Sequence, residues 1–207
     1  MRGTRESSIG IVNNKRLYET TPEIQAFTGI DDAAEYFKYT NKCGDTATPI
    51  DKEGFRGIGL ELLKELCEGI RWGQQAFSIG ADMPMTIKCA DFRGTTLGDY
   101  CDTTSEIRFR RGLKPEYAFS TAVHEMAHHA DHIMGHPSGD ILKAAVRKLR
   151  SDYSLKQINN MKAAIAGKYW TDPSEILAYS MDKYCLGKGN PLAAEVAEAF
   201  LRRCRQK

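Results

Sequence analysis

His124-Glu125-Met126-Ala127-His128 is the most informative stretch of this chain, because it places two imidazoles four residues apart with a carboxylate beside the first. In an α-helix, residues at i and i+4 lie on one face with Cβ atoms about 5–6 Å apart, so both rings can reach one ion. Glu125 lies about a quarter turn from His124, where it can face a water beside that ion without binding the ion itself. The pattern predicts a helical zinc site with its own general base.

The residues around this pattern predict an amphipathic helix from Glu116 to Met134. Gly135 ends this helix, and Pro137 follows soon after. Helical periodicity places a set of apolar residues on the side opposite the two histidines, so one side can be buried while the other faces a cleft. This apolar stripe consists of Phe119, Ala122, Val123, Met126, Ala130 and Ile133.

Outward from the motif, helical and alternating patterns predict an α+β fold that is mainly helical. We expect a small three- or four-stranded mixed sheet beside the motif helix. Residues 1–57 are broken by glycine and proline and are interpreted as an N-terminal extension or subdomain, with residues 58–207 as the main domain. The expected strands are 85–90, 97–101 and 106–110, and the other expected helices are 31–39, 58–79, 140–150, 155–166, 173–186 and 191–204.

Composition excludes several classes of protein. Lysine and arginine number 29 against 27 acidic residues, so a net charge of +2 offers no reason to expect nucleic acid or an anionic membrane as partner. There is no run of 18 apolar residues and no apolar core of a secretory signal near the N-terminus, so we expect a cytoplasmic protein. Virion packaging and non-classical export leave no such signal. The six cysteines form no C-x-x-C pair and are expected to be reduced thiols.

A catalytic zinc site needs a third protein ligand, and four residues are candidates. Glu175 is the first choice, because it starts a later helix that can approach the ion from another direction. With Asp172 as N-cap, however, Glu175 can instead complete a capping box. His136 is the second choice, because it follows Gly135, where the chain can turn back. Asp131 and His132 lie further along the motif helix, and Asp131 is better suited to accept the free ring N–H of a ligating histidine.

The segments "TAVHEMAHHAD" and "DPSEILAYSMDKY" resemble the zincin metallopeptidases of the gluzincin type, in which a downstream glutamate joins the two histidines. They look like the small metallopeptidase domains of phage and mobile-element polyvalent proteins, over residues 80 to 186. The metzincin pattern does not fit, because Met134 stands where its third histidine belongs. The resemblance implies a zincin-like fold for residues 58–207 and one zinc ion per chain, held by His124, His128 and Glu175.

From these residues we predict a zinc metallopeptidase, acting as an endopeptidase on a protein or peptide substrate. Glu125 is the predicted general base, and Tyr179 is the first choice to donate a hydrogen bond to the oxyanion, ahead of Tyr169 and Tyr184. The alternative is a zinc-bearing binding or structural module of a phage or mobile element, without turnover. A nuclease is less favoured, because no concentrated basic surface is indicated.

Substrate binding is expected at the strand 106–110, taken as a sheet edge that pairs with an extended peptide. Arg108 and Arg110 lie on one side of this strand and can select acidic side chains in the substrate. Alternatively, the two arginines merely keep an exposed edge soluble.

Overall fold

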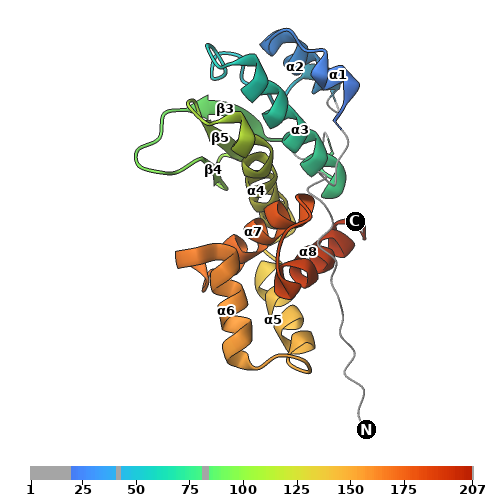
Figure 1. The fold of residues 1–207 in the computed structure, drawn as a ribbon. Coiled ribbons are helices and arrows are strands. Elements are labelled where there is room, and N and C mark those ends of the chain that lie inside the picture. The colour runs from blue at the N-terminus through green and yellow to red at the C-terminus, as the bar shows by residue number, and fades with distance from the viewer. Residues whose placement is uncertain (1–19, 41–42, 81–83, 207) are drawn as a thin grey trace.

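The computed structural model describes residues 20–40, 43–80 and 84–206. Within these ranges the chain forms eight α-helices, a single 3-10 turn at Gly167–Tyr169, a two-stranded sheet and a three-stranded sheet, which makes it a mixed α+β protein. The α4 helix, which carries the motif, lies between an upper group containing α3 and the sheet and a lower group of helices (Figure 1). The helices are α1 Pro22–Gln25, α2 Ile30–Tyr36, α3 Leu60–Ala76, α4 Pro115–Ile133, α5 Ser138–Leu149, α6 Leu155–Ala166, α7 Pro173–Cys185 and α8 Pro191–Cys204.

The buried side of α4 packs against α3 at very close range. A Cβ built on Gly69 of α3 would lie 2.6 Å from the Ala122 Cβ and 2.6 Å from the Phe119 carbonyl oxygen. One turn later, a Cβ built on Gly73 would lie 2.7 Å from the Met126 Cβ. Since real Cβ atoms do not come so close, these two glycines allow the helix backbones to approach each other. The predicted apolar stripe is buried here, apart from Ile133 at its end, which is partly buried.

The three-stranded sheet beside α4 has the order β3-β5-β4, from β3 Thr86–Ala90, β4 Gly98–Cys101 and β5 Glu106–Arg110. β5 runs parallel to β3 and antiparallel to β4, which confirms a small mixed sheet. The expectation that residues 106–110 form an edge strand is wrong, because β5 is hydrogen-bonded on both sides. Alternation of apolar and charged residues predicts a half-buried strand, and such a strand fits the centre of a sheet as well as its edge.

Residues 20–40 and 43–57 extend the same core, and α1 packs against α3. The fully buried carboxylate of Glu68 on α3 accepts hydrogen bonds from the Thr21 amide at 2.6 Å, the Thr21 hydroxyl at 3.0 Å and Gln25 Nε2 at 3.1 Å. Ile24 and Phe55 are among the residues that this segment adds to the buried cluster. The division at residue 57 stays a prediction, and its residues 1–19 lie outside the described ranges.

The shortest helix and strands were not predicted from the sequence, whereas the long helices were. The helix α1 and the strands β1 Tyr39–Thr40 and β2 Thr46–Ala47 are too short to show a period. α2 ends at Tyr36, before the predicted Tyr39, because the chain continues there into β1. From α3 to α8, each long helix lies within three residues of its predicted bounds.

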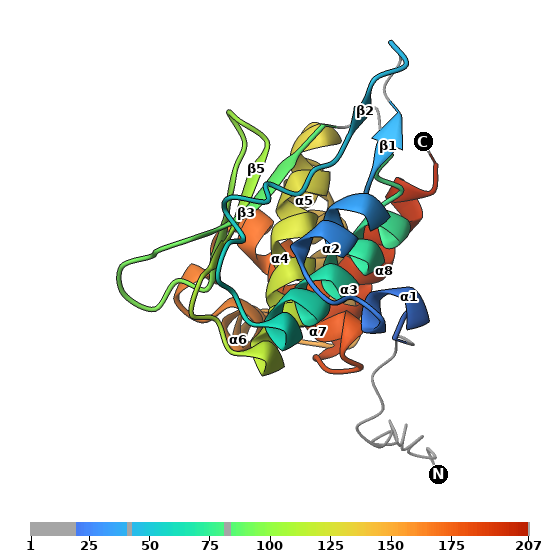
Figure 2. The same cartoon turned by 90° about the horizontal axis from the view of Figure 1, so that it is seen from above.

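The C-terminal helices bring a second segment to the motif helix. α7 packs against both α4 and α8, and Figure 2 shows α3, α4, α7 and α8 gathered in the middle of the molecule. Among the described residues, no helix combines the length and the apolar character needed to cross a membrane.

Candidate metal centre

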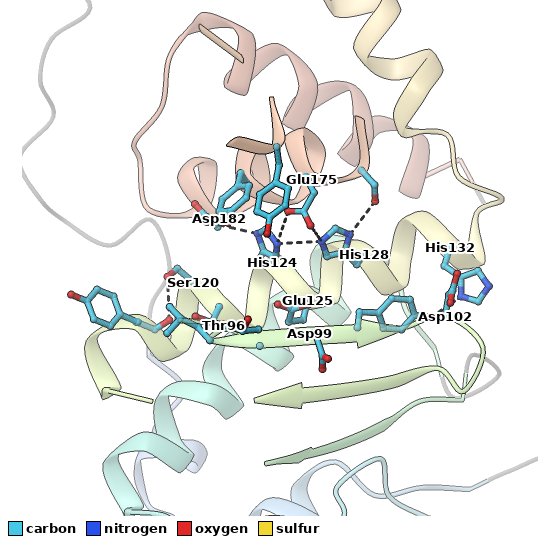
Figure 3. A pocket seen from close by; sticks show the side chains of 18 of the residues that line it. Thr96, Asp99, Asp102, Ser120, His124, Glu125, His128, His132, Glu175 and Asp182 are labelled. Carbon is cyan, nitrogen blue, oxygen red and sulfur yellow. Dashed lines mark hydrogen bonds and ion pairs between the residues drawn. The ribbon is translucent and has the colours of Figure 1, made fainter. Parts of the chain in front are cut away.

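Two histidines of α4 and one glutamate of α7 bring three potential metal ligands together (Figure 3). The Nε2 atoms of His124 and His128 are 3.2 Å apart. Glu175 places Oε2 at 3.6 Å from the His124 Nε2 and Oε1 at 3.9 Å from the His128 Nε2. One ligand atom from each of the three residues lies within 4.8 Å of the others, which is close enough for all three to reach a single ion after small adjustments. The group can bind a metal ion.

The first turn of α7 shows why Glu175 is available as a ligand. Asp172 is the N-cap, and its Oδ1 accepts hydrogen bonds from the amides of Ser174 at 2.9 Å and Glu175 at 3.4 Å. The Glu175 side chain does not close a capping box and points towards the two histidines instead (Figure 3). The cap is therefore complete without the Glu175 carboxylate.

The other candidate ligands lie elsewhere. Asp131 is 1% exposed, and its Oδ2 accepts a hydrogen bond from the Ser174 hydroxyl at 3.3 Å. His132 places Nδ1 2.5 Å from the Tyr100 hydroxyl. His136 has a side chain that is 58% exposed, with Nδ1 3.6 Å from the Asp131 Oδ2. The structure thus joins Glu175, and none of these three, to the histidine pair.

The charges at the centre favour a cation. Burial, followed by the neighbouring charge of His124, lowers the pKa of His128 to about 4, so this imidazole is neutral near pH 7. Burial also works to lower the pKa of His124, but Glu175 and other nearby carboxylates outweigh it and hold this pKa above its ordinary value. The hydrogen bond with His124 lowers the pKa of Glu175. A bound metal ion would compete with protons for these nitrogen and oxygen atoms.

Glu125 is buried on the cleft side of α4, beside the edge strand β4. Burial raises the pKa of Glu125 to about 7, the Asp99 carboxylate adds to this, and His124 opposes it. A pKa near neutrality suits a group that must both accept and return a proton. A Cβ built on Gly98 of β4 would lie 3.0 Å from the Glu125 Oε1, so glycine lets the strand pass directly over this carboxylate. Gly98 was not singled out in the sequence, because a lone glycine in a strand has many explanations.

Tyr179 lies against the first histidine, with ring centroids 4.4 Å apart and an interplanar angle of 67°. Burial, followed by the nearby carboxylate of Glu175, raises the pKa of Tyr179, so its hydroxyl keeps its proton and can donate a hydrogen bond. Tyr169 also lines the cleft, whereas Tyr184 is not among the lining residues. Of the three predicted tyrosines, Tyr179 is the one in contact with a candidate ligand.

The centre lies in a cleft of about 690 Å³ between β4, α4 and α7 (Figure 3). Ser174 and Asp182 are further residues of this cleft that were missed in the sequence. The Asp182 Oδ2 lies 4.0 Å from the His124 Nδ1, and burial raises the pKa of Asp182 to about 6. Its position seven residues after Glu175 places it on the same face of α7 and was the available signal.

Arg108 and Arg110 are engaged within the chain, which removes the basis for the expected preference for acidic substrates. Arg108 donates from Nε to the Asp99 Oδ1 at 2.7 Å and makes a second hydrogen bond to the other oxygen of that carboxylate. Arg110 donates to the carbonyl oxygens of Thr96 at 2.6 Å and Gly94 at 2.7 Å. Both guanidinium groups therefore brace the sheet and the loop before β4.

No family model, no curated protein and no solved structure matches this chain. The resemblance to gluzincins thus rests on the two motif segments.

Proposed function

We propose that the protein is a zinc-dependent metallopeptidase of gluzincin type, an endopeptidase that hydrolyses peptide bonds of a protein or peptide substrate. One observation carries the proposal: His124, His128 and Glu175 each bring one potential ligand atom within 4.8 Å of the others, while a buried carboxylate with a pKa of about 7 lies beside them. Two imidazoles and one carboxylate form a ligand set that suits zinc and leaves one position open for water. We therefore assign one zinc ion per chain to His124, His128 and Glu175.

When bound, zinc would polarise the scissile carbonyl and acidify a water molecule. Glu125 would accept a proton from that water while the water oxygen forms a bond to the carbonyl carbon. Glu125 then returns the proton to the leaving nitrogen as the C–N bond breaks, and its pKa of about 7 supports both transfers. Tyr179 keeps its proton and can donate a hydrogen bond to the carbonyl oxygen as negative charge develops there.

The geometry of β4 supports an extended peptide as substrate. Among the described residues, β4 pairs with β5 alone, and its residues Gly98 to Tyr100 line the cleft. Its unpaired edge can therefore offer backbone groups to a substrate chain laid along the cleft. We first expected the substrate peptide to pair with β5, and we now propose that it pairs with β4.

The competing proposal is a zinc-bearing module without turnover. Metal binding alone does not require a carboxylate at position 125, and burying a further acidic group at such a site raises its pKa and costs stability. The buried Glu125 thus favours a catalytic role, because a non-catalytic site gains nothing from that cost.

Zinc content and peptide cleavage, measured together, test the proposal. Glu125→Gln removes the base, and Glu116→Gln is the matched control, an exposed glutamate on the same helix. We expect about one zinc per chain in the parent and both variants, with cleavage of a broad peptide pool by the parent and Glu116→Gln only. Zinc in all three without any cleavage would favour the binding module. A parent protein that retains no zinc would overturn the proposal.

A further inference from the structure

The Ser174 hydroxyl lies between a candidate ligand and a buried carboxylate. Its Oγ is 3.0 Å from the His128 Nδ1 and 3.3 Å from the Asp131 Oδ2. The other oxygen of Asp131 accepts a hydrogen bond from the Ser138 amide at 2.9 Å, at the start of α5. One chain of contacts therefore joins α4, α5 and α7 behind the His128 ring.

The direction of these hydrogen bonds follows from the groups involved. The Ser174 hydroxyl has a single proton, and it donates this proton to the Asp131 Oδ2. The Ser174 oxygen is then left to accept, and its partner must be an N–H at the Nδ1 of His128. With the proton on Nδ1, the His128 Nε2 presents its lone pair towards His124 and Glu175, as a metal ligand must.

We infer that Ser174 and Asp131 are positioning residues, which hold His128 in its Nδ1–H tautomer and aim its Nε2 at the metal. The consequence for metal affinity rests on the proposed zinc site, whereas the tautomer does not. At the corresponding atom of His124, the Asp182 Oδ2 lies 4.0 Å from Nδ1. The first turn of α7 thus supplies one ligand, Glu175, and orients another.

The Ser174 hydroxyl can be removed without disturbing the helix cap. The cap uses the backbone amide of Ser174, which donates to the Asp172 Oδ1 at 2.9 Å. Ser174→Ala keeps this amide, and Ser174→Thr keeps both the amide and a hydroxyl. Ser151→Ala is the matched control, because it removes an exposed hydroxyl that donates only to a backbone carbonyl, that of Lys148.

The test uses the full chain and two readouts. In zinc-free protein, the ¹⁵N chemical shifts of the His128 ring, assigned with a His128→Gln variant, show which nitrogen carries the proton. We expect Nδ1–H in the parent, Ser174→Thr and Ser151→Ala, and a mixture of both tautomers in Ser174→Ala. In competition with a chelator, zinc affinity should fall about 10- to 100-fold in Ser174→Ala alone.

Each outcome decides the inference. An unchanged tautomer and an unchanged zinc affinity in Ser174→Ala would overturn it, as would an Nε2–H tautomer in the parent. A parent that binds no zinc would defeat the proposed function, yet the ring shifts would still show whether Ser174 and Asp131 hold the His128 tautomer.

Discussion

The two sides of α4 are both largely removed from water, but for different reasons. The side facing α3 is apolar and is filled by shape, with Gly69 and Gly73 admitting Ala122 and Met126. The cleft side buries imidazoles and a carboxylate, whose pKa values shift because water is removed from around them. The side facing α3 therefore stabilises the fold. The cleft side holds polar groups whose burial is unfavourable until a ligand compensates for it.

The largest effect is expected from removing the ligand that joins the cleft side of α4 to α7. Glu175→Ala should lower zinc affinity by more than about 100-fold, beyond the loss typical of an outer hydrogen-bond partner. The unfolding free energy of the zinc-free protein should change little, because Asp172 caps α7 without the Glu175 side chain. Metal analysis after dialysis and chemical denaturation measure the two quantities. Full zinc retention with lost stability would make Glu175 a structural residue.

A second prediction concerns the pH dependence of stability in the zinc-free protein. The pKa of Glu125 is raised from 4.5 to about 7 in the folded state. Its stabilising contribution is therefore complete below about pH 4.5 and is lost as the pH rises through 7. Between pH 5 and pH 8, the unfolding free energy of the parent should fall relative to that of Glu125→Gln by about 2–3 kcal/mol, at about 1.4 kcal/mol per pKa unit.

Denaturant unfolding of both proteins across this range measures the difference. His128 acts in the opposite direction, because its pKa is lowered to about 4 and its contribution is lost as the pH falls. It is present in both proteins and cancels in the comparison. Parallel stability curves for parent and variant would show that Glu125 is not protonated by burial.

The packed side of α4 is tested by a change of shape alone. Gly69→Ala would place a Cβ 2.6 Å from the Ala122 Cβ and should cost about 1–3 kcal/mol of unfolding free energy, as overpacking does. Gly139→Ala on α5 is the matched control, because a Cβ there meets no atom within 4 Å and should be neutral or stabilising. Equal stability of the two variants would show that α3 and α4 are not closely packed at Gly69.

The smallest effect is expected at the cap of α7. Asp172→Ala should cost about 1 kcal/mol of unfolding free energy, because it removes the acceptor for the Ser174 and Glu175 amides. Zinc should be retained, since the Glu175 carboxylate is unchanged. Zinc loss as severe as in Glu175→Ala would mean that the cap, and not the ligand, controls the metal centre.

Local patterns sufficed for much of the fold and for half of the candidate site. Helical periodicity located α4 and the other long helices, and the i, i+4 spacing brought His124 and His128 together, because both effects act within a few residues. Periodicity missed α1 and both strands of the two-stranded sheet, because these elements are too short to show a period. It also placed β5 at an edge, because alternation reports which side of a strand is buried and says nothing about its neighbours.

Local sequence patterns were enough to predict a histidine pair on one face of a helix, a carboxylate beside it and a capped helix that begins next to Glu175. Long-range packing was needed to show that this glutamate, and not Asp131, His132 or His136, faces the pair. It also decided that Gly98 passes over Glu125 and that Ser174 contacts His128. The physical reason is that helical spacing sets distances within α4, whereas distances between α4, β4 and α7 depend on how buried surfaces far apart in the chain pack together.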